Sequence, residues 1–419
     1  MRLLFLMISG LLLSSFGALS CTQGLVSDGQ TGEPIGDVEI TLYRWPPPES
    51  TSFSWEWPRH FRSGQPDYRQ RTSSTPFWGA NFGFGGSGRC SQAPEMEDIV
   101  APHQWYRAAL SKSGYYPGYF YFYHPGYEKE CQFMPCPDGT VATGHCHIQN
   151  FQLYRIGEVF PLLPDLIVDP REFEDYQWQC ALVPDGPPQI GLRIATGTAN
   201  VGQGSLHLIG EDTSNPNQSF VAQRVDYSDG TSRLNSLPPD SFEFHPGHQH
   251  IHFRNWVVLE ALRTDPSCRE RESRDDSVCK LGTSGKLSFC IMDLEPFDAD
   301  IRADYDGQQE YPDPPTCDSL FQGLSPGWKD VYHSELEGQV IRFGSLPGLQ
   351  LPEEILIEAE VDPTGLLEQR SRNNSIATLK MRTPENLDAI CANAETTIDC
   401  RGSLPTMDFR RRQQCPDYL

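Results

Sequence analysis

A short stretch of the sequence, FEFHPGHQHIHF at residues 242–253, holds four of the 11 histidines of this 419-residue chain. If residues 248–252 are extended, His248, His250 and His252 project from one face, because side chains alternate along a strand. Imidazole nitrogen binds copper, zinc, iron or nickel, and three histidines with an open position are typical of a catalytic metal. The spacing therefore predicts a metal site, with a metal-free surface cluster as the alternative. His245 lies outside this set, as an outer neighbour of the metal or a loop residue.

Two further stretches contain residues that could do chemistry. TSGKLSFC carries Lys286 at the head of an apolar alternating run, and QGLSPGWKDVYHSEL carries Tyr332 beyond a turn rich in Ser, Pro and Gly. Taken alone, the lysine is expected to be a surface charge that caps a strand. Taken alone, the tyrosine is expected to be a half-buried aromatic at the edge of a sheet.

Together, these three stretches resemble the catalytic domain of the lysyl oxidase family. HQHIH matches the family's copper motif at His248, His250 and His252, KLSFC matches its cofactor lysine at Lys286, and GLSPG precedes Tyr332 by five positions, as in the animal enzymes. All three occur in the family's order, between an opening PDLIVDP and a closing RNNS. The similarity spans about residues 163–380.

The resemblance implies a copper amine oxidase with lysine tyrosylquinone as its cofactor. Tyr332 would be the quinone precursor and Lys286 the cross-linking amine, which must be neutral to attack; burial would favour the neutral form. The implied reaction converts primary amines, including peptidyl lysine, to aldehydes, while molecular oxygen yields hydrogen peroxide and ammonia is released. A copper-binding cell-surface protein without oxidase activity is the alternative. A structural or carbohydrate-binding envelope module would leave the three motifs unexplained.

Several positions depart from the family's pattern. Three cysteines of the animal enzymes are replaced by Gly247, Trp328 and Gly338, so the disulfide network is expected to differ. The animal enzymes also have a histidine a few residues past the copper motif. The corresponding segment here is RNWVVLE, which has no histidine, so the catalytic base stays unassigned. Three cysteines do match: Cys180, Cys290 and Cys317. The resemblance also implies a weakly expected calcium site, with loop-capping side chains as the alternative. Its matching residues are Asp165, Glu368, Asn373 and Asn374, with Arg370 in place of an aspartate.

The elements that must position these residues are short alternating runs separated by turns, which predict a mostly β chain. Residues 22–157 resemble a prealbumin-like β-sandwich, interrupted by an aromatic, proline-rich insertion between Trp45 and about Gly88. After a proline-rich boundary, residues 160–382 predict a lysyl oxidase-like β-sandwich with long disulfide-pinned loops. Residues 383–419 are expected to be an extension pinned by disulfides.

The prealbumin-like resemblance raises a second metal hypothesis. Intradiol dioxygenases share that sandwich and bind iron through tyrosine and histidine, which draws attention to His145, His147 and nearby tyrosines. The favoured interpretation is that both histidines lie near a strand end next to Cys146.

The N-terminus and the composition indicate the compartment. Residues 1–20 have the charged, apolar and small-residue regions of a secretory signal. Cleavage before Cys21 would resemble a bacterial lipoprotein signal and tether the protein to an envelope; an ordinary disulfide cysteine is the alternative. Setting Cys21 aside leaves an even 12 of the 13 cysteines, as suits an oxidising compartment. The net charge of −23 argues against nucleic acid as a partner and is compatible with cationic amines, with solubility of a secreted protein as the simpler explanation of the acid excess.

Overall fold

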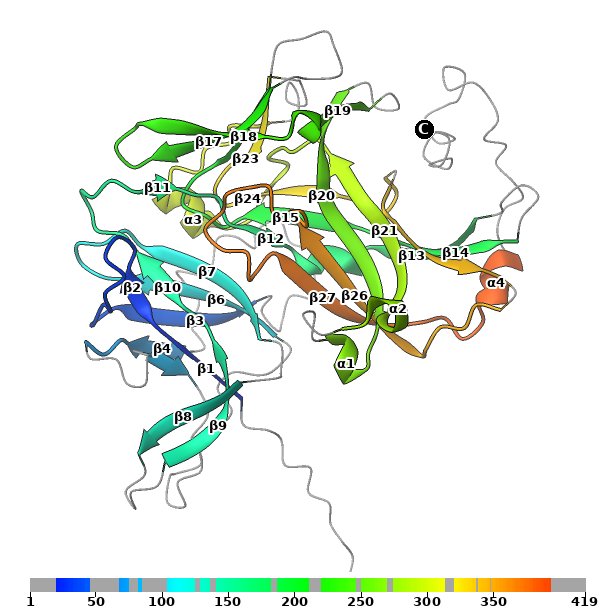
Figure 1. Cartoon of the computed structure of the whole chain (residues 1–419), viewed down its shortest axis with the longest axis horizontal. Helices are drawn as coiled ribbons and strands as arrows, with labels where there is room; N and C mark the ends of the chain where they lie inside the picture. Colours follow the sequence, from blue (N-terminus) through cyan, green and yellow to red (C-terminus); the bar gives the residue numbers. More distant parts are fainter. Residues whose placement is uncertain are drawn as a thin grey trace, which may run out of the picture.

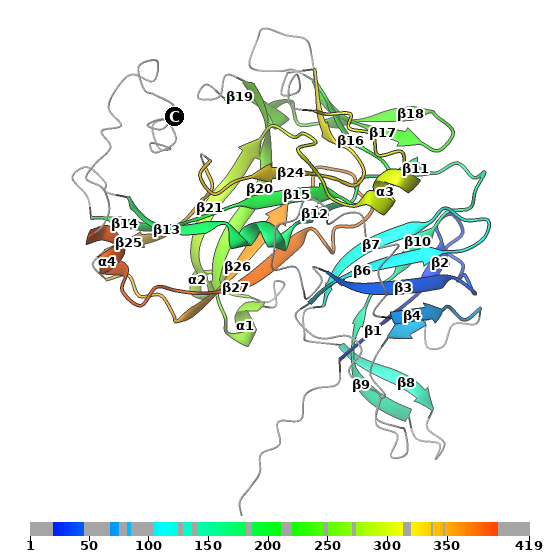
Figure 2. The same cartoon turned by 180° about the vertical axis from the view of Figure 1, so that it is seen from behind.

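The computed structural model describes the chain in a series of ranges: 20–45, 68–74, 82–84, 104–124, 129–135, 141–181, 187–210, 220–245, 250–269, 274–312, 320–336, 338–346 and 348–392. Within these ranges the chain is mostly β, as predicted, with six sheets and few short helices. No helix in the described ranges is long and apolar enough to cross a membrane. Figures 1 and 2 show the strands up to β10 grouped beside the strands of the rest of the chain.

The N-terminal strands form three sheets. The four-stranded sheet β4-β3-β6-β7 is antiparallel, and β10-β2 is a parallel pair. A third sheet has the order β5-β1-β9-β8. The bounds are β1 Ser20–Gly24, β2 Val26–Asp28, β3 Glu39–Trp45, β4 Tyr68–Arg71, β5 Phe82–Phe84, β6 Gln104–Ser111, β7 Gly118–His124, β8 Lys129–Pro135, β9 Val141–Ile148 and β10 Phe151–Leu153.

A compact apolar core explains why apolar and polar residues alternate along these strands. Ile40 and Leu42, at alternate positions of β3, are fully buried and pack with Phe120 and Phe151 in one cluster. The aperiodic insertion after Trp45 nevertheless contributes β4 and β5, which pair with β3 and β1. Pairing with existing strands, rather than sequence periodicity, supports these two short elements.

The remaining strands form three larger sheets: β11-β17-β16-β23 with β18 on β17, β12-β15-β24-β22, and β13-β14-β25-β21-β20-β26-β27 with β19 on β20. Their bounds are β11 Pro161–Leu162, β12 Leu166–Val168, β13 Tyr176–Ala181, β14 Gln189–Ile194, β15 Thr196–Asn200, β16 Leu206–Ile209, β17 Val221–Tyr227, β18 Ser232–Leu237, β19 Phe242–His245, β20 His250–Arg263, β21 Lys280–Phe289, β22 Glu295–Pro296, β23 Phe321–Leu324, β24 Trp328–Tyr332, β25 Val340–Ser345, β26 Glu354–Val361 and β27 Ile376–Arg382.

Between the strands lie short helices, and two disulfides have both of their cysteines in the described part of the chain. The helices are η2 Pro170–Glu174, η3 Pro239–Ser241, α1 Pro266–Arg269, α2 Asp276–Cys279, α3 Ala299–Asp304 and α4 Leu387–Ala392. One disulfide joins Cys268 to Cys279, and another joins Cys180 in β13 to Cys391 in α4. The second bond ties α4 to the eight-stranded sheet, while the rest of the predicted C-terminal extension lies outside the described residues.

Strand β20 is the longest strand of the described chain and carries the histidine motif at its start. Its edges pair with β21 and β26, and its first residues also pair with β19. Asn255 has a φ of 56°, and the pairing with β21 shifts register between Phe253 and Val257. Asn tolerates this left-handed conformation, so a bulge separates the histidine end of the strand from its apolar end.

A buried ion cluster joins the N-terminal strands to the rest of the chain. Arg107 of β6 is 1% exposed, and its guanidinium donates to Asp298 at 2.7 Å and to Asp300 at 2.9 Å, both at the start of α3. Burial alone would raise the pKa of Asp298, but Arg107 outweighs that effect and lowers it. Trp45 packs edge-on against Phe297 with ring centroids 5.4 Å apart. The two parts of the chain therefore share one packed interface.

We expect Arg107→Ala to lower the free energy of unfolding by about 3–5 kcal/mol, because it leaves two buried carboxylates without their cation. Chemical denaturation followed by tryptophan fluorescence measures the change. Arg71→Ala is the matched control, since Arg71 makes exposed ion pairs with Asp37 and Glu39 and should have a far smaller effect. Equal effects of the two substitutions would contradict a central role for the buried cluster.

Candidate functional site

His250 and His252, the second and third histidines of the motif, lie at the start of strand β20. His250 and His252 place their Nε2 atoms 2.9 Å apart, and His252 is 3% exposed. Two imidazole nitrogens bound to one ion at about 2.0–2.1 Å and at a right angle would lie about 2.9 Å apart, so this pair fits a shared metal. His248 lies outside the described residues. His245 ends β19, and the backbone register sets it opposite His250.

The lysine and the tyrosine come from two other strands. Lys286 lies six residues inside β21, opposite Val258 of β20, rather than at the head of a strand as expected, and its side chain is outside the description. Tyr332 is the last residue of β24. Its ring stacks on Phe289 of β21 with centroids 3.7 Å apart, and its hydroxyl donates to the carbonyl of Cys290. Tyr332 therefore packs directly against the strand that carries Lys286.

One buried glutamine links the tyrosine to the histidine strand. The amide nitrogen of Gln322 donates at 2.8 Å to the carbonyl of Ile251, which lies between the two histidines. Its amide oxygen accepts from the backbone nitrogen of Ile291 at 3.2 Å. Ile291 follows Cys290, the acceptor of the Tyr332 hydroxyl. This run of contacts brings the histidine pair and the tyrosine into one neighbourhood.

The structure adds Asp330, which the sequence analysis missed. Asp330 is 0% exposed, and within the described chain its carboxyl oxygens make no hydrogen bond of ordinary geometry, although the Tyr332 hydroxyl and the backbone of Met292 lie close enough to offset part of the rise in its pKa. Burial raises its pKa well above the ordinary value, while burial and the charge of Asp330 together raise the pKa of Tyr332. The signal in the sequence was its position two residues before Tyr332, which places both on one face of a strand.

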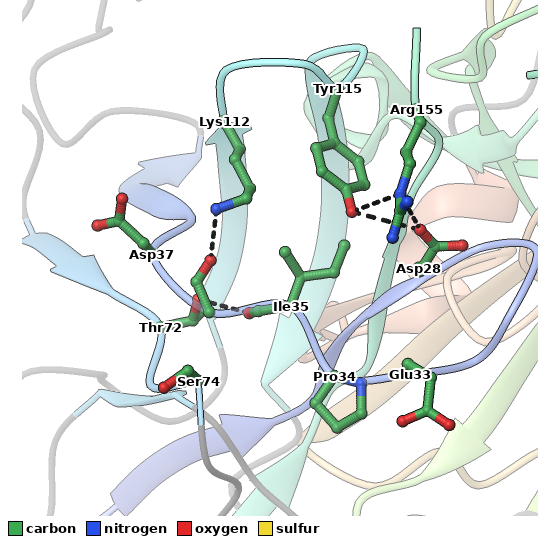
Figure 3. Close-up of a pocket in the computed structure, with 11 residues that line it drawn as sticks. Asp28, Glu33, Pro34, Ile35, Asp37, Thr72, Ser74, Lys112, Tyr115 and Arg155 are labelled. Carbon is green, nitrogen blue, oxygen red and sulfur yellow. Dashed lines mark hydrogen bonds and ion pairs between the residues drawn. The ribbon is translucent and has the colours of Figure 1, made fainter. Parts of the chain in front are cut away.

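A separate hollow of about 390 Å³ lies among the N-terminal strands (Figure 3). Three of its charged side chains are engaged: Arg155 donates to Asp28 and to the Tyr115 hydroxyl, each at 2.9 Å, and Lys112 donates to the carbonyl of Gly36 at 2.7 Å. Its lining residues all come from the N-terminal region. These contacts stabilise the loops around the hollow.

The iron hypothesis for the N-terminal region stays untested. His145 and His147 lie in the second half of β9, where their backbones pair with Ser20 and Thr22 of β1. Cys146 lies between them, opposite Cys21. The side chains of the two histidines are outside the description.

Sequence comparison relates the chain to lysyl oxidases. Protein-lysine 6-oxidase of Gallus gallus is 25% identical over 224 residues, which cover 52% of this chain and 45% of the relative. The Homo sapiens protein is 23% identical over 267 residues, 63% of this chain and 52% of the relative. The Sus scrofa protein is 24% identical over 224 residues, 52% and 76% respectively. The chain thus spans about half the length of the first two relatives.

No family model matches the chain. Among solved structures, 3-chlorocatechol 1,2-dioxygenase from Rhodococcus opacus has a TM-score of 0.19 at 13% identity, covering 33% of this chain and 61% of that chain. The major pilin subunit of Bacillus cereus also has a TM-score of 0.19, at 10% identity, with 86% and 67% covered. Scores this low carry no argument. The comparisons therefore establish a distant relationship to protein-lysine 6-oxidases.

The residues expected to bind calcium do not fit a calcium site. Asp165 is fully buried and pairs with Arg370, whose Nε and Nη2 donate to one carboxyl oxygen at 2.9 and 2.5 Å; Asn374 donates to the other at 3.0 Å. Glu368 instead pairs with Arg233 at 2.5 Å, and Asn373 is exposed. Calcium needs six to eight oxygen ligands. The guanidinium of Arg370 already supplies the positive charge that Asp165 requires.

We expect calcium and a chelator such as EGTA to leave the unfolding temperature of the protein unchanged. Arg370→Ala should lower the free energy of unfolding by about 3–5 kcal/mol, because Asp165 would stay buried without its cation. Differential scanning calorimetry and urea titration measure the two effects. Arg382→Ala, at an exposed position of β27, is the control, and stabilisation of the unaltered protein by calcium would refute this assignment.

Proposed function

We propose that this protein is a copper-dependent amine oxidase that converts primary amines, including the side chains of peptidyl lysine, to aldehydes with release of hydrogen peroxide and ammonia. The proposal depends most on one arrangement. His250 and His252 on β20, with their converging nitrogens, are connected to the Tyr332 hydroxyl on β24 through the hydrogen bonds of Gln322 and the adjacent backbone of Cys290 and Ile291. The distant relationship to protein-lysine 6-oxidases supports the same reaction class.

In this proposal the three histidines of the motif, His248, His250 and His252, hold the copper ion. Tyr332 and Lys286 supply the ring and the amine of lysine tyrosylquinone, which when formed serves as the two-electron acceptor of the reaction. Phe289 fixes the plane of the Tyr332 ring by stacking on it. The Tyr332 hydroxyl donates a hydrogen bond to the carbonyl of Cys290, and this contact orients the hydroxyl.

The net charge of the chain favours a cationic substrate, and its disulfides favour a location outside the reducing cytoplasm. The net charge of −23 attracts protonated amines, and two disulfides fit an oxidising compartment. We therefore propose a secreted or envelope location, with a lipid on Cys21 as the candidate anchor. We also propose that residues 22–157 form a prealbumin-like module attached to a catalytic unit at 160–382.

Copper loading in air is expected to produce a visible quinone absorption and a covalent peptide that joins Lys286 to Tyr332. Absorption spectroscopy and peptide mass spectrometry detect the two products. Tyr332→Phe should remove both, together with peroxide release from butylamine, because phenylalanine lacks the oxygen from which the quinone begins. Lys286 and Tyr332 left unmodified in the copper-loaded protein would rule out the oxidase.

Measuring copper binding distinguishes the role of the histidines from the role of the cofactor residues. His252→Ala is expected to lower the copper content after dialysis severalfold, because it removes one imidazole of the converging pair, whereas Tyr332→Phe should retain copper. Metal analysis and the electron paramagnetic resonance signal of the bound ion measure this. Full copper binding by His252→Ala would exclude the motif as the metal site. Copper retention without the quinone in the unaltered protein would favour the copper-binding, non-oxidising alternative.

A further inference from the structure

Asp330 is a buried acid beside the residue that would become the cofactor. It lies on β24 opposite Thr198 of β15, two residues before Tyr332, so the Asp330 and Tyr332 side chains share a face of the strand. Both of its carboxyl oxygens are buried and make no hydrogen bond of ordinary geometry in the described part of the chain. An unsatisfied buried carboxyl costs free energy. A group kept at such a cost beside a reactive residue is a candidate for a role in the chemistry.

The charged neighbours of Asp330 do not neutralise it. Lys329, the adjacent residue, points to the other face of β24 and pairs with Asp169 at 3.4 Å and with Glu295 at 3.2 Å. Asp293, the other acid near Asp330, accepts hydrogen bonds from Ser325 and from the backbone of Tyr311. Burial raises the pKa of Asp330 well above its ordinary value, and the charge of Asp293 adds to the rise; the nearby Tyr332 hydroxyl and Met292 backbone offset only part of it. An acid with a raised pKa is a stronger base once it loses its proton.

We propose that Asp330 is the general base that removes a proton from the carbon next to the nitrogen of the bound amine. The inference rests on the proposed amine oxidase function. The C–H bond breaks, its proton passes to an Oδ of Asp330, and its electron pair would be taken by the two-electron acceptor that Lys286 and Tyr332 would form. Oxygen then takes the two electrons and two protons to form hydrogen peroxide. Water supplies the aldehyde oxygen, and the nitrogen leaves as ammonia.

Asp330→Asn tests this assignment, because the amide resembles the neutral acid in shape but accepts no proton. We expect the variant to form the same visible absorption on copper loading and to react with phenylhydrazine in the same amount as the unaltered protein. Anaerobic mixing with butylamine should bleach that absorption about 10²–10⁴-fold more slowly. Asp306→Asn is the control, since Asp306 is exposed and its φ of 54° suits asparagine.

The possible outcomes distinguish failure of the Asp330 assignment from failure of the proposed amine oxidase function. Bleaching of Asp330→Asn within threefold of the control overturns the base assignment while the oxidase stands. Loss of the absorption in Asp330→Asn alone also overturns it, by placing Asp330 in cofactor formation. Failure of the unaltered protein to form the absorption defeats the proposed function and the base together. In the unaltered protein, the bleaching rate should rise with pH as Asp330 ionises and should fall when the amine carries deuterium on the reacting carbon; absence of both overturns the assignment.

The unfolding of the copper-free protein gives a readout that needs no activity. The pKa of Asp330 is raised in the folded state above its ordinary value of 3.8. The folded state therefore binds its proton more tightly, and this contribution to stability is lost as pH rises from about 4 through the raised pKa. Asp330→Asn removes the effect, so the variant should gain stability relative to the unaltered protein as pH rises. A difference that does not vary with pH would show that Asp330 is not a buried titrating group and overturns the base.

Discussion

The hydrogen bonding of β20 along both edges is the constraint on which the candidate site depends. Because β21 and β26 fix its register, a slip by one residue would turn its buried side chains to the opposite face. Trp256 and Leu259, both fully buried, make such a slip costly. The apolar end of this strand therefore holds the histidine end in place, and the bulge at Asn255 lets the two ends face different surroundings.

Strand alternation predicted most of the β-structure because each run has an apolar face that the core buries. The run IATLKMR matches β27 residue for residue, and the run HIHFRNWVVLEAL matches β20 except for its last residue, Arg263. Lys286 was placed wrongly at a strand head because KLGTSG, which precedes it, has little apolar character and enters β21 only through pairing with β20 and β25. The pattern of apolar residues within a segment does not indicate that the segment will pair with a strand distant in the sequence.

Residues of the candidate site could be predicted only where their type and spacing indicate a chemical role. Histidines at alternate positions and the lysine and tyrosine motifs could be recognised without a structure, although their assigned roles remain proposals. Asp330 could not be recognised in this way, because an aspartate between Lys329 and Val331 looks like an ordinary solvent-facing residue of a strand. Its burial results from packing of β24 against β15. Arg370 was noticed as a departure, but only the geometry revealed that its charge serves Asp165.

The disulfide between Cys180 and Cys391 spans 211 residues and encloses every residue assigned to the candidate site. A protease that cuts once anywhere between those two cysteines leaves both pieces joined. Secreted proteins meet proteases long after synthesis, so a single nick in an exposed loop would neither release the histidine strand nor separate it from the tyrosine. Durability of the site against such damage is thus built into the covalent connectivity of the chain.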